Sequence, residues 1–152
     1  MGISAKEMSK RLSQVANEVY LKNLVNEGIV ENESKLIAIK KDEYEKGNIY
    51  SNGKSRTYAW EWYRKEKELM NPKASGFVDL IYSGSFIGAF ELIEKGKGYI
   101  FKSNDRKSIL LENKYNNSKS NIFDLNQDVF NNFINKYVRK DFIKAIKTQL
   151  GQ

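Results

Sequence analysis

The sequence predicts an α+β fold in which a small antiparallel β-meander is packed by an N-terminal helix and a long C-terminal helix. Apolar residues recur at helical spacing over residues 5–27 and 127–150. Residues 77–103 instead combine dense apolar runs with glycine-containing turns, which is typical of strands. At 152 residues the chain fits one domain, 1–152, that is large enough to bury a core.

The first element is a helix over residues 5–27. Ser4 precedes it as a plausible N-cap, with Glu7 three residues later in capping-box register, and Gly28 is a natural end. We expect this helix to pack on the sheet by its apolar face. After it, residues 29–49 leave two interpretations open, since the segment KLIAIK fits either a short strand or a helical turn.

An arm and an aromatic segment follow, together spanning residues 41–73. The polar stretch 41–57 contains the turn signal Asn52-Gly53 and predicts an extended arm or loop. Residues 57–70, TYAWEWYRKEKELM, alternate aromatic and other side chains at their start. This period of two predicts a strand that runs into a helical turn, which Asn71-Pro72 ends.

The predicted meander occupies residues 77–103. Its first strand is Phe77–Tyr82, and Ser83-Gly84-Ser85 then indicates a bulge or sharp bend. A second strand over Phe86–Ile93 is joined to a third, Tyr99–Phe101, by a turn with two glycines at residues 95–98.

A short helix that begins near Ser103 and reaches Tyr115 leads to the last helix, which Asn126 caps. This helix covers residues 127–150 and is about 36 Å long at 1.5 Å per residue. So long a stripe exceeds what a small sheet covers and suggests packing against a neighbouring subunit. The apolar stripe consists of Phe130, Phe133, Ile134, Tyr137, Val138, Phe142, Ala145, Ile146 and Leu150.

Composition excludes several kinds of chemistry. The chain has no cysteine and no histidine, which removes thiol nucleophiles, Ser-His-Asp relays and Cys/His zinc sites. Its carboxylates are scattered, and no phosphate-binding glycine motif is present. We therefore expect no enzyme and predict no catalytic, cofactor-binding or metal-binding residue. No run approaches the length of a membrane span, so we expect a soluble protein without membrane contact or small-molecule substrate.

The net charge of +7 and the pI of about 9.4 predict an anionic neighbour, either nucleic acid or an acidic protein. Most of the excess lies in residues 54–73 and 129–152. In the last helix the candidate DNA-facing residues are Arg139, Lys140, Lys144 and Lys147.

The aromatic segment leaves three interpretations open. Aromatic rings interleaved with cations can stack nucleobases, anchor a protein interface, or simply fill the core. The candidate interface residues, which include three from the last helix, are Tyr58, Trp60, Trp62, Tyr63, Arg64, Phe130, Tyr137 and Phe142.

Five short motifs suggest a family. In order along the chain they read YEKGNIYSNG from Tyr44, VDLIYSGSF from Val78, IFKSND from Ile100, KSILLENKY from Lys107 and IFDLNQDVF from Ile122. With the tyrosine-containing run to Tyr63, this order resembles a group of small structural proteins of tailed bacteriophages, including the crAss-like phages of Bacteroidetes. The likeness covers about residues 36–135. Ser83, Ser85 and Asn116 depart from the pattern, which has Thr, Asp and Gly there.

The resemblance implies a neck, ring or tail-completion component that joins portal and tail in the virion and is made in the bacterial cytoplasm. It implies copies of itself, the portal and neighbouring neck or tail proteins as partners, with packaged DNA as a further partner by charge. Two alternatives stay open: a nucleic-acid-binding domain that uses the basic and aromatic surface, and a host-directed phage effector.

Overall fold

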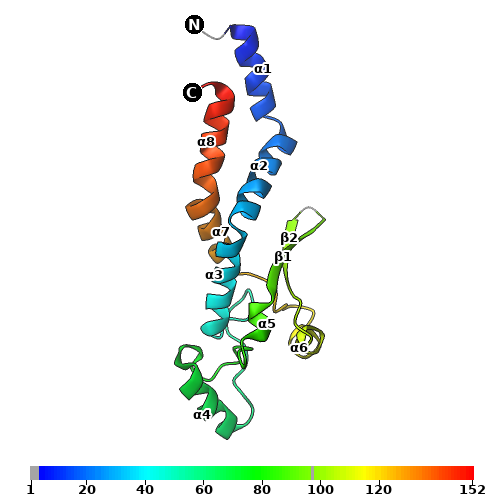
Figure 1. Cartoon of the computed structure of the whole chain (residues 1–152), viewed down its shortest axis with the longest axis vertical. Coiled ribbons are helices and arrows are strands. Elements are labelled where there is room, and N and C mark those ends of the chain that lie inside the picture. The colour runs from blue at the N-terminus through cyan, green and yellow to red at the C-terminus, as the bar shows by residue number, and fades with distance from the viewer. Residues whose placement is uncertain (1–3, 97) are drawn as a thin grey trace. The chain divides into compact units, whose positions relative to one another are not determined.

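The computed structural model describes residues 4–96 and 98–152 and confirms the predicted mixture of helices and an antiparallel sheet (Figure 1). The chain forms two compact units. The first joins the two ends of the chain, up to Glu33 and from Phe130 onward, and the second comprises Ser34–Val129. The expectation of a single domain stays a prediction.

The first unit contains α1 (Ala5–Val15) and α2 (Glu18–Glu31), which follow one another along the chain, and α8 (Arg139–Leu150), which runs beside them (Figure 1). The sequence predicts one helix over 5–27, and this is wrong because the helix breaks at Ala16 and Asn17. Asn17 has extended backbone and its side-chain oxygen accepts hydrogen bonds from two N–H groups of the next turn, so it starts α2. Ser4 caps α1 as predicted, accepting a hydrogen bond from the Glu7 N–H.

The predicted end at Gly28 is also wrong, because α2 continues through it. Gly28 is buried where α2 meets η2 (Ile134–Val138), a π-helical turn. A Cβ on Gly28 would stand 2.7 Å from Val138 Cγ1, closer than real Cβ contacts come. The glycine therefore allows a close approach between the two helices and does not end α2.

The predicted C-terminal helix is present as a continuous run of α7 (Gln127–Phe133), η2 and α8. Its predicted cap is confirmed: Asn126 Oδ1 accepts hydrogen bonds from the N–H groups of Asp128 at 2.8 Å and Val129 at 3.3 Å. The sequence did not predict the π-helical turn, a feature that inserts one residue into a helix.

Helices α1 and α8 bury little of their apolar surface. Neither helix contains a buried residue, although both are amphipathic. Leu12 in α1 is 52% exposed and Ile143 in α8 is 41% exposed. In Figure 1 the first turns of α1 extend past the end of α8. Within the apolar stripe of the C-terminal helix only Phe133 and Val138 are buried, both in its first half.

The second unit is built on helices with one small sheet. Residues 29–49, which the sequence left open, are helical up to Glu45 except for a turn at Asn32. The predicted arm at 41–57 is the end of the second of these helices followed by a loop. The elements are α3 (Glu33–Glu45), α4 (Glu61–Met70), η1 (Pro72–Ala74), α5 (Ser85–Gly88), β1 (Phe90–Lys95), β2 (Gly98–Ser103) and α6 (Ser108–Tyr115).

The sheet has two strands among the described residues, with β1 antiparallel to β2 from Phe90 opposite Ser103 to Lys95 opposite Gly98. The predicted first strand, Phe77–Tyr82, is wrong. It makes one isolated bridge, between Phe77 and Thr57. The Asp79 side chain there accepts a hydrogen bond from the N–H of Ile81, and this local bond turns the backbone away from a ladder. The predicted second strand is also wrong before Phe90, because Ser85–Gly88 forms the helical turn α5.

Aromatic and aliphatic side chains from α3, α5 and β1 form the core of this unit. Tyr44 is completely buried, contacts Phe86 and Phe90 edge to face, and donates a hydrogen bond of 2.6 Å to the Ile122 carbonyl. Lys40 is buried beside it, where its ammonium group donates to the carbonyls of Ile49 and Asp124. Side-chain hydrogen bonds therefore hold loops that carry little regular structure.

Candidate functional site

A buried ion pair organises the most distinctive site in the second unit. Lys67 of α4 and Asp79 of the following loop have side chains only 3% and 1% exposed, and Lys67 Nζ lies 2.9 Å from Asp79 Oδ1. Lys67 also donates to the Ile81 carbonyl. Charges this deeply buried are retained only where further hydrogen bonds compensate them.

Asp79 receives those further bonds from three neutral donors. The Tyr58 hydroxyl lies 3.0 Å from Oδ1, the Ile81 N–H lies 3.0 Å from the same oxygen, and Asn71 Nδ2 lies 2.7 Å from Oδ2. Asn71 donates also to the Glu45 carbonyl at the end of α3. One carboxylate thus fixes the segment before α4, α4 itself and the residue that ends it.

A groove of about 460 Å³ lies beside this network, and we call it the aromatic groove. Its rings contact one another in series. Tyr58 and Tyr63 meet edge to face at 5.0 Å, Tyr63 meets Trp62 at 5.6 Å, and Trp62 meets Trp60 at 6.0 Å. The lining residues are Tyr58, Ala59, Trp60, Trp62, Tyr63, Lys114 and Tyr115.

The two tryptophans are not core residues. Trp60 is 68% exposed and Trp62 is 63% exposed, so the interpretation of this segment as core is wrong for both. It holds in part for Tyr58, which is half-buried and packs against the core. The predicted strand is absent: α4 begins at Glu61, the Trp60 before it has extended backbone, and Thr57 makes only an isolated bridge with Phe77.

The tyrosine hydroxyls of the groove are neutral at physiological pH. Burial raises the pKa of Tyr58, and the Asp79 carboxylate raises it further. Burial raises the pKa of Tyr63 and of Tyr115 as well. The Lys67 and Asp79 side chains beside the groove are themselves sealed from solvent.

Positive charge is concentrated at one side of the aromatic groove. The Lys114 ammonium group lies 5.4 Å and the Arg56 guanidinium group 5.8 Å from the centre of the Tyr115 ring. Neither takes part in an ion pair within the described part of the chain. On α4, by contrast, Lys65 is paired with Glu61 at 3.0 Å.

The structure places three of the candidate interface residues, Phe130, Tyr137 and Phe142, in the first unit. Phe130 and Tyr137 are half-buried and flank the buried Phe133 ring, at 6.2 and 5.6 Å, and Phe142 is half-buried in α8. Arg64, on α4, is half-buried against Gly76. All four candidate DNA-facing residues are exposed: Arg139, Lys140, Lys144 and Lys147.

Sequence reasoning missed the groove's support and its charged side. Asp79 carried a signal in the sequence, since it is the one charged residue in the apolar run from Phe77 to Tyr82. A lone carboxylate in such a run indicates a buried polar contact. Lys67 looked like any cation of a surface helix. Lys114 and Tyr115 had no signal, because only the fold brings α6 to the segment before α4.

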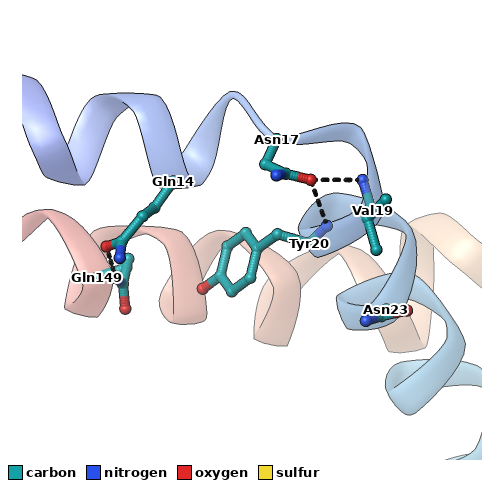
Figure 2. A pocket seen from close by; sticks show the side chains of 6 residues that line it. All are labelled: Gln14, Asn17, Val19, Tyr20, Asn23 and Gln149. Atoms are coloured by element: carbon teal, nitrogen blue, oxygen red, sulfur yellow. Dashed lines mark hydrogen bonds between the residues drawn. The ribbon is translucent and has the colours of Figure 1, made fainter.

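A second hollow, of about 370 Å³, lies in the first unit where α1 gives way to α2 (Figure 2). Figure 2 shows the Tyr20 ring directed toward α8 and the Gln14 and Gln149 amides in contact, with a hydrogen bond of 2.8 Å. The Asn17 amide caps α2. These amide groups of the hollow bond to one another or to the backbone where the helices meet. The lining residues are Gln14, Asn17, Val19, Tyr20, Asn23 and Gln149.

Within the described residues, no group of three or more carboxylates is placed to hold a metal ion, and no helix has the length and apolarity that a membrane crossing requires. Comparison with protein-family models, with curated proteins and with solved structures finds no match for this chain.

Proposed function

We propose that this protein is a structural assembly component that acts by binding neighbouring subunits. The observation that carries the proposal is the α1 and α8 pair, in which neither helix buries a residue. An isolated helix of 11 residues is marginal in water, so α1 depends on tertiary packing for its stability. The packing that the chain itself supplies is incomplete, which favours a further layer from another subunit.

The resemblance to tailed-phage proteins gives this role a setting. In that setting the protein is a multi-copy neck, ring or tail-completion component of the virion, and its neighbours are copies of itself, the portal and tail proteins. A second copy suits the exposed apolar residues of the first unit, because their equivalents on the other copy would cover them. These residues are Leu12, Val19, Val30 and Ile143.

The test is the mass of the purified protein in solution, measured by light scattering at rising concentration in low salt and in about 1 M salt, where the Debye length is only about 3 Å. We expect a multimer that persists in high salt, because apolar contacts are not screened. Leu12→Gln with Ile143→Gln should dissociate it, whereas Leu69→Gln, an exposed leucine on α4, should not. A wild-type monomer at every concentration would contradict self-assembly.

One observation favours a second function, nucleic-acid binding. The four basic residues of α8 are exposed, and none forms an ion pair in the described part of the chain. A duplex bound by them should dissociate steeply with added salt. Lys140→Glu with Lys144→Glu should then abolish DNA binding, measured by fluorescence anisotropy, without changing the mass of the multimer.

A further inference from the structure

We propose that the aromatic groove binds an extended, acidic, proline-containing segment of a partner protein. This proposal rests on the proposed function, because it takes the protein to be an assembly component. It adds the chemistry of one binding partner, which the proposed function does not specify. The groove and the α1 and α8 pair belong to different units. Their tests can therefore fail independently of each other.

The shape of the groove favours an extended peptide. Grooves lined by tyrosine and tryptophan recognise polyproline II segments, whose rings lie flat on the aromatic faces. Here the rings form a continuous series from Tyr58 through Tyr63 and Trp62 to Trp60. The volume of about 460 Å³ suits a few side chains and not a folded surface.

The polar groups of the groove complement such a backbone. Indole and ammonium groups can only donate hydrogen bonds, and Trp60, Trp62 and Lys114 provide them here. A polyproline II segment forms no internal hydrogen bonds, and its carbonyls are free to accept. The Tyr58 hydroxyl is already bound to Asp79, so it supports the wall of the groove and is not available to a ligand.

Charge then selects an acidic segment. Arg56 and Lys114 place two cations beside the Tyr115 ring, and neither forms an ion pair in the described structure, so a carboxylate of the ligand would complete the site. A second copy of the chain fits poorly, because the chain carries a net charge of +7 and a single proline, Pro72.

A single-stranded nucleic acid fits less well than an acidic peptide. Nucleic-acid grooves follow the backbone with a row of cations. Beside this groove, α4 carries three acidic and three basic residues, and its cations Arg64, Lys65 and Lys67 already face carboxylates. Two cations suit one or two carboxylates and not a polyanion.

The wall of the groove is set in advance of binding. Tyr58 is held by Asp79, which is held in turn by Lys67 and Asn71. A preorganised site loses less conformational entropy when it binds. The buried ion pair thus contributes to recognition through Tyr58, without touching the ligand.

The test uses the full chain and three probes of equal length: a blocked peptide of alternating proline and glutamate, the same peptide with lysine for glutamate, and an oligothymidylate. The chain has two tryptophans, both in the groove, so two indole N–H signals in a ¹⁵N-correlated NMR spectrum report binding directly. We expect the glutamate peptide alone to shift both signals saturably.

Two sets of variants complete the test. Arg56→Glu with Lys114→Glu should weaken binding of the glutamate peptide at least tenfold, whereas Lys102→Glu with Lys119→Glu, the same charge change at exposed sites elsewhere, should not. Trp60→Ala should weaken it about tenfold, as anchor residues do. Equal shifts from the lysine peptide, tighter binding of the oligothymidylate, or no saturable shift from the glutamate peptide would each overturn the proposal.

Discussion

Asp79→Asn should be among the most destabilising single substitutions in the second unit. The change leaves the Lys67 ammonium buried without its counter-charge, and its new amide nitrogen replaces an acceptor that Asn71 Nδ2 approaches to 2.7 Å. Removing one member of a buried pair costs about 3–5 kcal/mol. We expect the free energy of unfolding to fall by that amount, a large share of the roughly 5–15 kcal/mol typical of a domain.

Lys67→Met should cost less than Asp79→Asn. Asp79 keeps its three neutral donors when Lys67 is replaced, whereas Lys67 keeps only hydrogen bonds and no negative charge when Asp79 is replaced. Lys67→Met leaves the buried Asp79 carboxylate without its counter-charge but with those donors, and the Ile81 carbonyl loses the Lys67 donor, a loss that costs about 1–3 kcal/mol. In the double variant no unpaired charge is left, so its total cost should fall short of the sum of the two single costs by about 1–3 kcal/mol.

Urea unfolding followed by tryptophan fluorescence measures these changes, because both tryptophans belong to the second unit. The coupling energy between Lys67 and Asp79 comes from a double-mutant cycle, that is, from the urea midpoints and slopes of the wild type, the two single variants and the double variant. Leu69→Gln is the control, as an exposed site on the same helix as Lys67. An Asp79→Asn cost below about 1 kcal/mol, or strict additivity in the cycle, would refute the argument that this charge is paired and sealed from water.

Two further predictions concern other buried contacts. Gly28→Ala should lower the thermal midpoint by the equivalent of about 1–3 kcal/mol, because its methyl group would overlap Val138. Adding Val138→Ala to this variant should restore part of the loss. Circular dichroism melts of the single and the double variant test both expectations. Burial lowers the pKa of Lys40 to about 7, against opposing effects of Asp124 and Glu43. Above pH 7 the unfolded chain therefore binds more protons at Lys40 than the folded chain does. The free energy of unfolding should rise from pH 7 toward pH 10 by at most about 1.4 kcal/mol per pH unit. Denaturant titrations of Lys40→Met should not show this rise.

Local signals in the sequence predicted the fold best. Ser4 and Asn126 were recognised as caps because a cap bonds only to its own next turn. The C-terminal helix was predicted over its full length because its apolar stripe persists along the whole run. Asn17 was missed although it is also a cap, since apolar residues continue at helical spacing on both sides of it and conceal the break.

Tertiary contacts account for what the sequence did not predict. Phe77–Tyr82 has the composition of a strand, yet Lys67, Tyr58 and Asn71 converge on Asp79 and fix this segment as a loop. In the candidate site the two tryptophans were found because they are neighbours along the chain. Lys114 and Tyr115 reach them only through the folded position of α6, which no local pattern encodes.

The positioning of Tyr58 gives a reason for a polar network at a place where apolar side chains would suffice for stability. Buried pairs are often no more stabilising than hydrophobic replacements of the same shape. Apolar replacements for Lys67 and Asp79 would, however, leave the Tyr58 hydroxyl without its acceptor and free to turn. With Asp79 present, the ring of Tyr58 has a fixed position against Tyr63, and the rest of the aromatic series follows from that contact. The network therefore favours one groove geometry over others, and a groove of fixed geometry is what an exposed aromatic surface requires to discriminate between partners.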